Sequence, residues 1–133
     1  MRRSTAGWLE IGGKRIYARS KWEKNYARYL QFLKENGGID DWEHEPDTFW
    51  FDGIKRGVTS YLPDFKVFGP DRDEDGLFVV RYHEVKGYMD GKSKTKLKRM
   101  AKYHPEVEMI LVDGPAYKAL AKLMKPVLAD WES

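Results

Sequence analysis

Two acidic residues and a lysine lie in two neighbouring strand-like segments of the sequence. Asp64 follows Pro63 in an aromatic and β-branched run, and Glu84-Val85-Lys86 closes a second such run. Because side chains alternate along a strand, Glu84 and Lys86 share one face while Val85 points to the other. Hard divalent cations such as Mg²⁺ bind carboxylate oxygens together with water and substrate phosphate. The three charged residues therefore predict a phosphodiesterase centre.

The competing interpretation is a solvated charged face, because Asp, Glu and Lys are common on strands and Glu-x-Lys often occurs by chance. The context favours the functional interpretation. Glu84 follows the apolar run 77–80, and twenty residues separate it from Asp64. That separation is enough for one strand to end, for the chain to turn, and for a second strand to return beside the first. We expect the two carboxylates to meet.

Pro63, Asp64, Glu84 and Lys86 resemble the signature of the PD-(D/E)xK nuclease superfamily, which has the restriction-endonuclease-like fold. Together with Ser20-x-x-Glu23, the residues Tyr61-x-Pro-Asp-Phe and Glu84-Val-Lys-Gly look most like those of small phage endonucleases and archaeal-type Holliday junction resolvases. The resemblance covers residues 20 to about 113. It implies an α/β fold with an αβββαβ core, in which helices flank a mixed central sheet.

The resemblance also implies roles for individual residues. Asp64, Glu84 and the backbone carbonyl of Val85 would hold one Mg²⁺ or Mn²⁺, and Lys86 would orient or activate the attacking water. Glu23 would reach a metal directly or through water. A structural role for Glu23 stays open beside this one, because Ser20 and Glu23 fit a capping box, in which the glutamate returns to the N-cap amide.

The substrate that the resemblance implies is DNA, with the branched four-way junction foremost. Resolvases of these families act as homodimers, because a four-way junction needs two symmetric cuts. A flap, nicking or sequence-specific endonuclease is the alternative within the same chemistry. A nucleic-acid-binding module without catalysis is the alternative from another class. A calcium-binding protein built on the acidic loop 71–75 is a third, although Tyr82 stands where an EF-hand needs a bidentate glutamate.

Apolar periodicity predicts the elements that must position these residues. They are a helix over 20–36, strands over 42–51 and 58–68 joined by a hairpin loop at 52–57, a strand over 77–86, a helix over 92–104, a strand over 108–112 pairing in parallel, and a last helix that starts after Pro115 and includes Val127. Pro46 would place the first of these strands at an edge or interrupt it with a bulge. Glu43 and Glu45 alternate with Trp42 and His44, which predicts a solvated acidic face, although similar phage nucleases can carry polar residues here near the site.

Residues 1–18 predict a basic N-terminal arm or short hairpin, and residues 19–133 a single nuclease domain. Leu97, Met100, Ala101 and His104 keep helical spacing, so the bases around them would cover the outer face of a helix. We expect contacts with the DNA backbone from the following basic residues: Lys92, Lys94, Lys96, Lys98, Arg99, Lys102, Arg15 and Arg19.

Composition narrows the class of protein. The chain has 133 residues, enough for one modest core, and a formal net charge of only +3, so the uneven distribution of charge matters more than its sum. Without cysteine there is no disulfide framework or thiolate metal site. The sequence has no signal peptide and no apolar run of membrane-spanning length, which predicts an intracellular, cytoplasmic protein, in the host cytoplasm if a phage encodes it. His44, His83 and His104 are expected to be satisfied surface or core residues rather than metal ligands.

Overall fold

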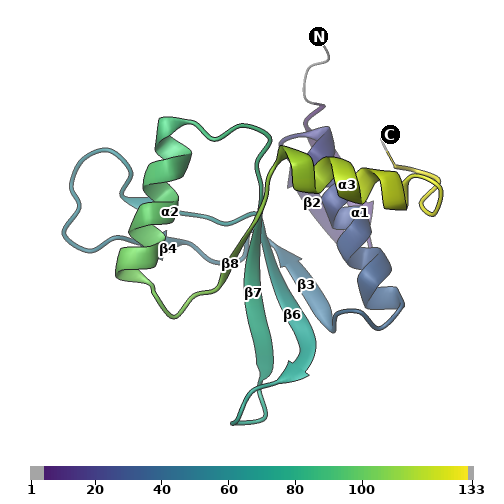
Figure 1. The fold of residues 1–133 in the computed structure, drawn as a ribbon, viewed down its shortest axis with the longest axis horizontal. Coiled ribbons are helices and arrows are strands. Elements are labelled where there is room, and N and C mark those ends of the chain that lie inside the picture. The colour runs from purple at the N-terminus through teal and green to yellow at the C-terminus, as the bar shows by residue number, and fades with distance from the viewer. Residues whose placement is uncertain (1–4, 132–133) are drawn as a thin grey trace.

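The computed structural model describes residues 5–131, which form eight strands and three helices (Figure 1). The strands are β1 (Gly7–Ile11), β2 (Lys14–Ala18), β3 (Asp41–His44), β4 (Phe49–Trp50), β5 (Ser60–Tyr61), β6 (Phe65–Arg72), β7 (Phe78–Val85) and β8 (Met109–Val112). The helices are α1 (Lys21–Glu35), α2 (Gly91–Tyr103) and α3 (Gly114–Met124).

The central sheet has four strands in the order β3-β6-β7-β8. β6 is antiparallel to both β3 and β7, and β8 pairs with β7 in parallel after the crossover through α2. The predicted mixed sheet and its parallel last strand are therefore confirmed. The sheet brings the start of β6, next to Asp64, beside the end of β7, next to Lys86, because Phe65 pairs with His83.

Helix α1 forms where its sequence predicts it. The Ser20 hydroxyl caps the helix by accepting a hydrogen bond from the Glu23 amide at 3.1 Å. Tyr26, Ala27 and Leu30 form its buried stripe. The helix ends before Gly37, whose φ of +79° is a left-handed conformation that glycine adopts without strain.

The two faces of the central sheet carry separate hydrophobic clusters. Phe65, Val67 and Val112 point to one face, where they pack with α1 and α3 in the main core. Tyr82 contacts Phe49 of β4 on the opposite face, at 5.1 Å between ring centroids. A second cluster around Met100 lies there and joins α2 to the β4–β5 segment. Figure 1 shows α2 on the other side of the sheet from α1 and α3.

Two predicted strands are wrong in their extent. The strand expected over 42–51 stops at His44 and resumes as β4, because Glu45 has a φ of +50° and Pro46 follows it. The strand expected over 58–68 is likewise interrupted between β5 and β6. Within residues 5–131, β4 and β5 pair only with each other, and the predicted loop 52–57 connects them. The result is a small hairpin outside the central sheet.

Of the two structures predicted for the N-terminal segment, an arm or a short hairpin, residues 7–18 form the hairpin, in which β1 is antiparallel to β2. Its inner face packs on the main core through Leu9, Ile11 and the buried Ile16. Its outer face carries Trp8 and Tyr17 in an edge-on contact. Residues 1–4 of the predicted arm lie outside the described residues.

The last helix is shorter than predicted, since it ends at Met124 and leaves Val127 exposed beyond it. Trp131 folds back into the main core against Tyr117. Trp131 and Phe51 are therefore core residues, whereas Trp50 is 62% exposed. Within residues 5–131, the helices are too short and too polar to cross a lipid bilayer.

The acidic loop 71–75 belongs to the exposed turn between β6 and β7. Asp73 organises it by accepting hydrogen bonds from the amides of Asp75 and Leu77 at 2.9 and 3.0 Å. Strands flank the turn on both sides, whereas a calcium-binding EF-hand needs helices there.

Candidate active site

Asp64 and Glu84 are locked together through the backbone. The Asp64 amide donates to the Glu84 carboxylate at 3.1 Å, and the Val85 amide donates to the Asp64 carboxylate at 2.9 Å. Both side chains are therefore fixed by the pairing of β6 with β7 rather than by flexible contacts. Asp64 and Glu84 therefore lie next to each other, as predicted.

Burial and mutual repulsion make this pair unusually basic. Asp64 is only 6% exposed, and its pKa is raised to about 8 by burial first and by the charges of Glu84 and Glu23 next. Burial also raises the pKa of Glu84. Both carboxyl groups therefore take up a proton more readily than they would in water.

The acids open into a cleft of about 690 Å³ at the carboxyl end of β7. Its lining includes Glu23, Asp64, Glu84, Val85, Lys86 and Lys96. The cleft is thus formed by the first turn of α1, the residues just before β6, the end of β7 and one side of α2. All the residues predicted to be catalytic, together with Val85, line this single cleft.

Tyr61 adds a group that the sequence prediction missed. Its side chain is 3% exposed and lines the cleft, and its buried hydroxyl lies beside the Glu84 carboxylate. Burial raises the pKa of Tyr61, and the neighbouring charge of Glu84 raises it further. The hydroxyl therefore stays protonated beside the carboxylate. The Lys96 ammonium lies 5.7 Å from the centre of the Tyr61 ring.

Glu23 combines the two roles that the sequence left open. It is 5% exposed and lines the cleft, and its charge contributes to the raised pKa of Asp64. One of its oxygens accepts from the Arg19 amide at 3.3 Å, one residue before the N-cap amide that a capping box uses. The side chain thus supports the start of α1 and still faces the acids.

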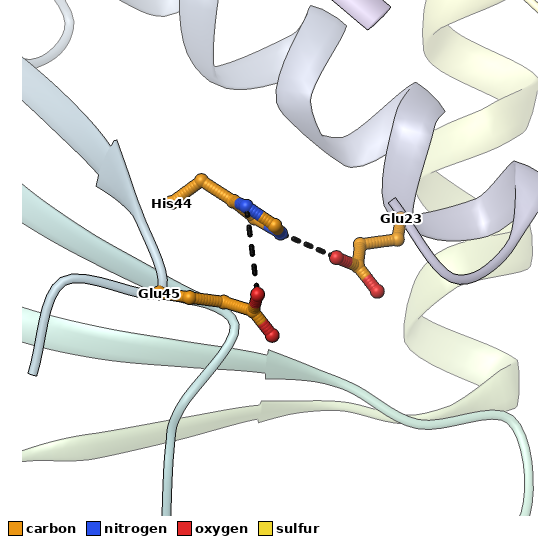
Figure 2. Close-up of side chains that lie close together, drawn as sticks. All are labelled: Glu23, His44 and Glu45. Carbon is orange, nitrogen blue, oxygen red and sulfur yellow. Dashed lines mark hydrogen bonds and ion pairs between the residues drawn. The ribbon is translucent and has the colours of Figure 1, made fainter. Parts of the chain in front are cut away.

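His44 and Glu45 complete a second group that shares Glu23 (Figure 2). The His44 Nε2 lies 2.5 Å from Glu23 Oε2, and its Nδ1 lies 3.8 Å from Glu45. Within residues 5–131, this is the trio whose ligand atoms all lie within 4.8 Å of one another; Glu23, Asp64 and Glu84 do not meet that limit together. The structure thus offers cation ligands on both sides of Glu23.

Arg19 supplies positive charge to both groups. Its guanidinium forms a close ion pair with Glu45 and lies 3.9 Å from carboxylate oxygens of Glu23 and Asp64. The side chain is still 58% exposed. Arg19, predicted as a DNA contact, is therefore part of the acidic site itself.

The other predicted DNA contacts fall into four environments. Lys92, Lys94, Lys98 and Lys102 are exposed on α2, and Lys96 lines the cleft. Arg99 instead donates to the backbone carbonyl of Val58 in the neighbouring loop. Arg15 stacks on Trp8 at 4.4 Å, on the outer face of the N-terminal hairpin. Ala101, placed on the inner face by its spacing, is exposed.

The three histidines have separate partners. His83 Nδ1 is 2.5 Å from the Tyr26 hydroxyl, and burial lowers the pKa of His83 to about 4, so its ring is neutral at pH 7. His104 contacts the Trp50 carbonyl at 2.8 Å. Only His44 lies at the acidic site.

Comparisons with known proteins return no family to which the chain can be assigned. No family model, no curated protein and no solved structure matches it.

Replacing Asp64 with Asn should stabilise the protein at alkaline pH. The carboxyl titrates near pH 3.8 when unfolded and near 8 when folded, so the fold binds the extra proton and loses stability as pH rises through that window. In EDTA at pH 8.5, we expect Asp64→Asn to raise the free energy of unfolding by about 2 kcal/mol and Tm by about 5 °C or more. Near pH 4 the difference should vanish. Thermal unfolding followed by circular dichroism across pH 4–9 measures both.

Asp47→Asn is the matched control. The hydrogen bond from Tyr82 and the ion pair with Lys66 hold the pKa of Asp47 below its usual range. Its charge stabilises the fold above the unfolded pKa, and that contribution disappears as pH falls through the lower folded pKa. The Asn variant should therefore be less stable than the parent at pH 8.5. A lower Tm for Asp64→Asn at pH 8.5 would contradict the assignment of charge crowding.

Truncating His44 should destabilise the protein because it removes the partner of the buried Oε2 atom of Glu23. Both side chains are 6% exposed. We expect His44→Ala to cost about 1–3 kcal/mol in urea unfolding and His44→Gln to recover part of it, since an amide can also donate to the carboxylate. A double-mutant cycle with Glu23→Gln should show a coupling of about 0.5 kcal/mol or more. Strict additivity would show that the two side chains do not act together.

Proposed function

We propose that the chain is a metal-dependent DNA endonuclease with a restriction-endonuclease-like core, selective for branched DNA such as the four-way junction. One observation carries the proposal: Asp64 and Glu84 converge on one cleft together with Lys86. This is the arrangement that hydrolysis of a phosphodiester with a bound divalent cation requires, and that the resemblance to PD-(D/E)xK nucleases implies.

The topology supports the same proposal. The sequence of elements α1, β3, β6, β7, α2 and β8 has the αβββαβ order, with the fourth strand added in parallel. The β4–β5 hairpin is then an insertion between the first two core strands. Asp64 lies just before β6 and Glu84 near the end of β7, the two middle strands of the sheet, and the resemblance implies acids at this place.

The donor set fits a hard divalent cation. Asp64 and Glu84 offer carboxylate oxygens, and burial raises the pKa of both, so a cation bound between them would favour their ionised forms. Asp64, Glu84 and the Val85 carbonyl would hold Mg²⁺ or Mn²⁺, with Glu23 as a further ligand. When bound, such an ion lowers the pKa of water and neutralises charge on the phosphoryl group.

The chain's own residues do the positioning. The amides of Asp64 and Val85 fix the two carboxylates before any substrate arrives, so little reorganisation is needed during the reaction. The Lys86 ammonium would orient the attacking water and stabilise charge on the phosphate. Lys96 and Arg19, which also line the cleft, would bind the neighbouring phosphates.

Junction resolution adds a requirement on assembly. Two symmetric cuts need two sites related by a two-fold axis, so the active species would be a homodimer on a four-way junction. Such an enzyme would act in the cytoplasm of a prokaryote or of the host of a phage.

A nucleic-acid-binding module without catalysis is the second candidate, favoured by the exposed lysines of α2. A cleavage assay separates the two, with junction, flap, single-stranded and linear duplex substrates in Mg²⁺ and in EDTA. Products that need Mg²⁺ support the endonuclease. Binding without product on every substrate supports the module.

Glu84→Gln should abolish cleavage and retain DNA binding. The amide keeps the size of the side chain and can still accept from the Asp64 amide, but it removes the charge that would hold the cation. We expect single-turnover cleavage to fall by at least about 10²-fold, with a Kd for junction DNA within about threefold of the parent.

The control is Glu43→Gln, which removes the same charge from an exposed position on β3. It should leave the cleavage rate unchanged. Undiminished cleavage by Glu84→Gln, or an equal loss in the control, would remove the site assignment.

A further inference from the structure

We propose that the β4–β5 hairpin and α2 form one preassembled DNA grip, in which the hairpin loop binds the phosphate backbone of a duplex arm through Lys55 and Arg56. We call residues 49–61 together with 91–103 the hairpin–helix unit. The proposal rests on the proposed function and extends it to how DNA is held away from the cleft. Figure 1 shows α2 and the segment beyond β4 on the side of the molecule away from α1 and α3.

The hairpin–helix unit has a hydrophobic cluster of its own. Phe51, Tyr61 and Met100 are its buried residues, at 2%, 3% and 2% exposure. Half-buried side chains from the hairpin, from α2 and from the segment after it pack around them: Phe49, Ile54, Val58, Tyr103, Val107 and Met109. This cluster is separate from the main core, so the loop is supported from beneath rather than loose in solvent.

Two polar contacts tie the hairpin to α2. The Arg99 guanidinium donates to the Val58 carbonyl on the β5 side of the loop. His104, at the end of α2, contacts the Trp50 carbonyl on the β4 side at 2.8 Å. A loop held on both sides loses little further freedom when it binds, which favours affinity.

Charge identifies the ligand as a polyanion. The hairpin–helix unit carries eight basic side chains and one acid, Asp52, a formal charge of +7, whereas the whole chain carries +3 and the remainder therefore −4. Six of these bases are exposed or near the surface, and within residues 5–131 none of the six forms an ion pair: Lys55, Arg56, Lys92, Lys94, Lys98 and Lys102. Unpaired bases on two adjacent elements fit the repeating phosphates of DNA.

The unit is continuous with the cleft. Tyr61 of the hairpin and Lys96 of α2 both line it beside Glu84 and Lys86. A DNA strand with its scissile phosphate at the acids would therefore continue onto the unit. Backbone contacts of this kind set the position of DNA without reading its sequence, which suits an enzyme that selects DNA by shape.

The test is the salt dependence of binding by the double variant Lys55→Gln/Arg56→Gln. Each lost phosphate contact lowers the slope of log Kobs against log salt by about 0.9, so the double variant should lose about 1.8. Between 50 and 200 mM KCl, the affinity of the parent should then fall about tenfold more than that of the variant. Fluorescence anisotropy with a labelled linear duplex in EDTA measures this without metal or cleavage.

Lys118→Gln/Lys122→Gln on α3 is the matched control, with two exposed lysines removed outside the unit. Its salt slope should equal that of the parent. Equal Tm values show that each double variant is folded. An unchanged slope for the hairpin variant, an equal drop in both variants, or tighter binding of duplex RNA than of DNA would overturn the proposal.

The cleavage assay on the parent keeps this proposal distinct from the proposed function. If the parent cuts no substrate but the hairpin variant alone loses salt slope, the unit is a DNA grip and the nuclease assignment fails. If the parent cuts DNA and the slopes agree, the nuclease assignment survives and the grip is wrong.

Discussion

The site depends on holding Glu23, Asp64 and Glu84 close together in a place where water does little to screen them. Burial disfavours ionisation of these acids, and like charges nearby add to that cost, so the pKa of Asp64 is raised to about 8. The structure offsets the cost with backbone amides, because Asp64 and Val85 each donate across the β6–β7 pair. The same strand pairing that builds the central sheet therefore also builds the acidic site.

The sequence was sufficient for α1, for the mixed sheet and for the meeting of Asp64 with Glu84, because each follows from local periodicity and one hairpin's separation. It was not sufficient for Glu45. Strict alternation along a strand places Glu45 with Glu43 on the solvated face. The φ of +50° at Glu45 ends β3 and breaks that alternation, which lets the carboxylate reach Arg19 and His44. Pro46 was the only local signal of the break.

The basic run of α2 shows a different limit. In the sequence, its lysines and arginine form one uniform charged stripe. In the structure their environments differ. Arg99 donates to the Val58 carbonyl of the β4–β5 hairpin, Lys96 lines the cleft, and the others are exposed to solvent. These different environments of the basic residues depend on contacts with the β4–β5 hairpin, which lies some forty residues earlier in the chain. Helical periodicity alone does not contain it.

The hairpin–helix unit and the rest of the chain carry opposite formal charges, which would affect how a polyanion such as DNA binds. The cleft holds buried acids whose pKa values are raised, so their ionised forms are favoured when a cation binds, whereas the hairpin–helix unit carries a formal charge of +7. Under the proposed function, affinity and chemistry would therefore have different sources, one governed by salt and the other by the divalent ion. Such a nuclease would bind DNA through the hairpin–helix unit even without the cation, whereas its acids would act only with the cation bound.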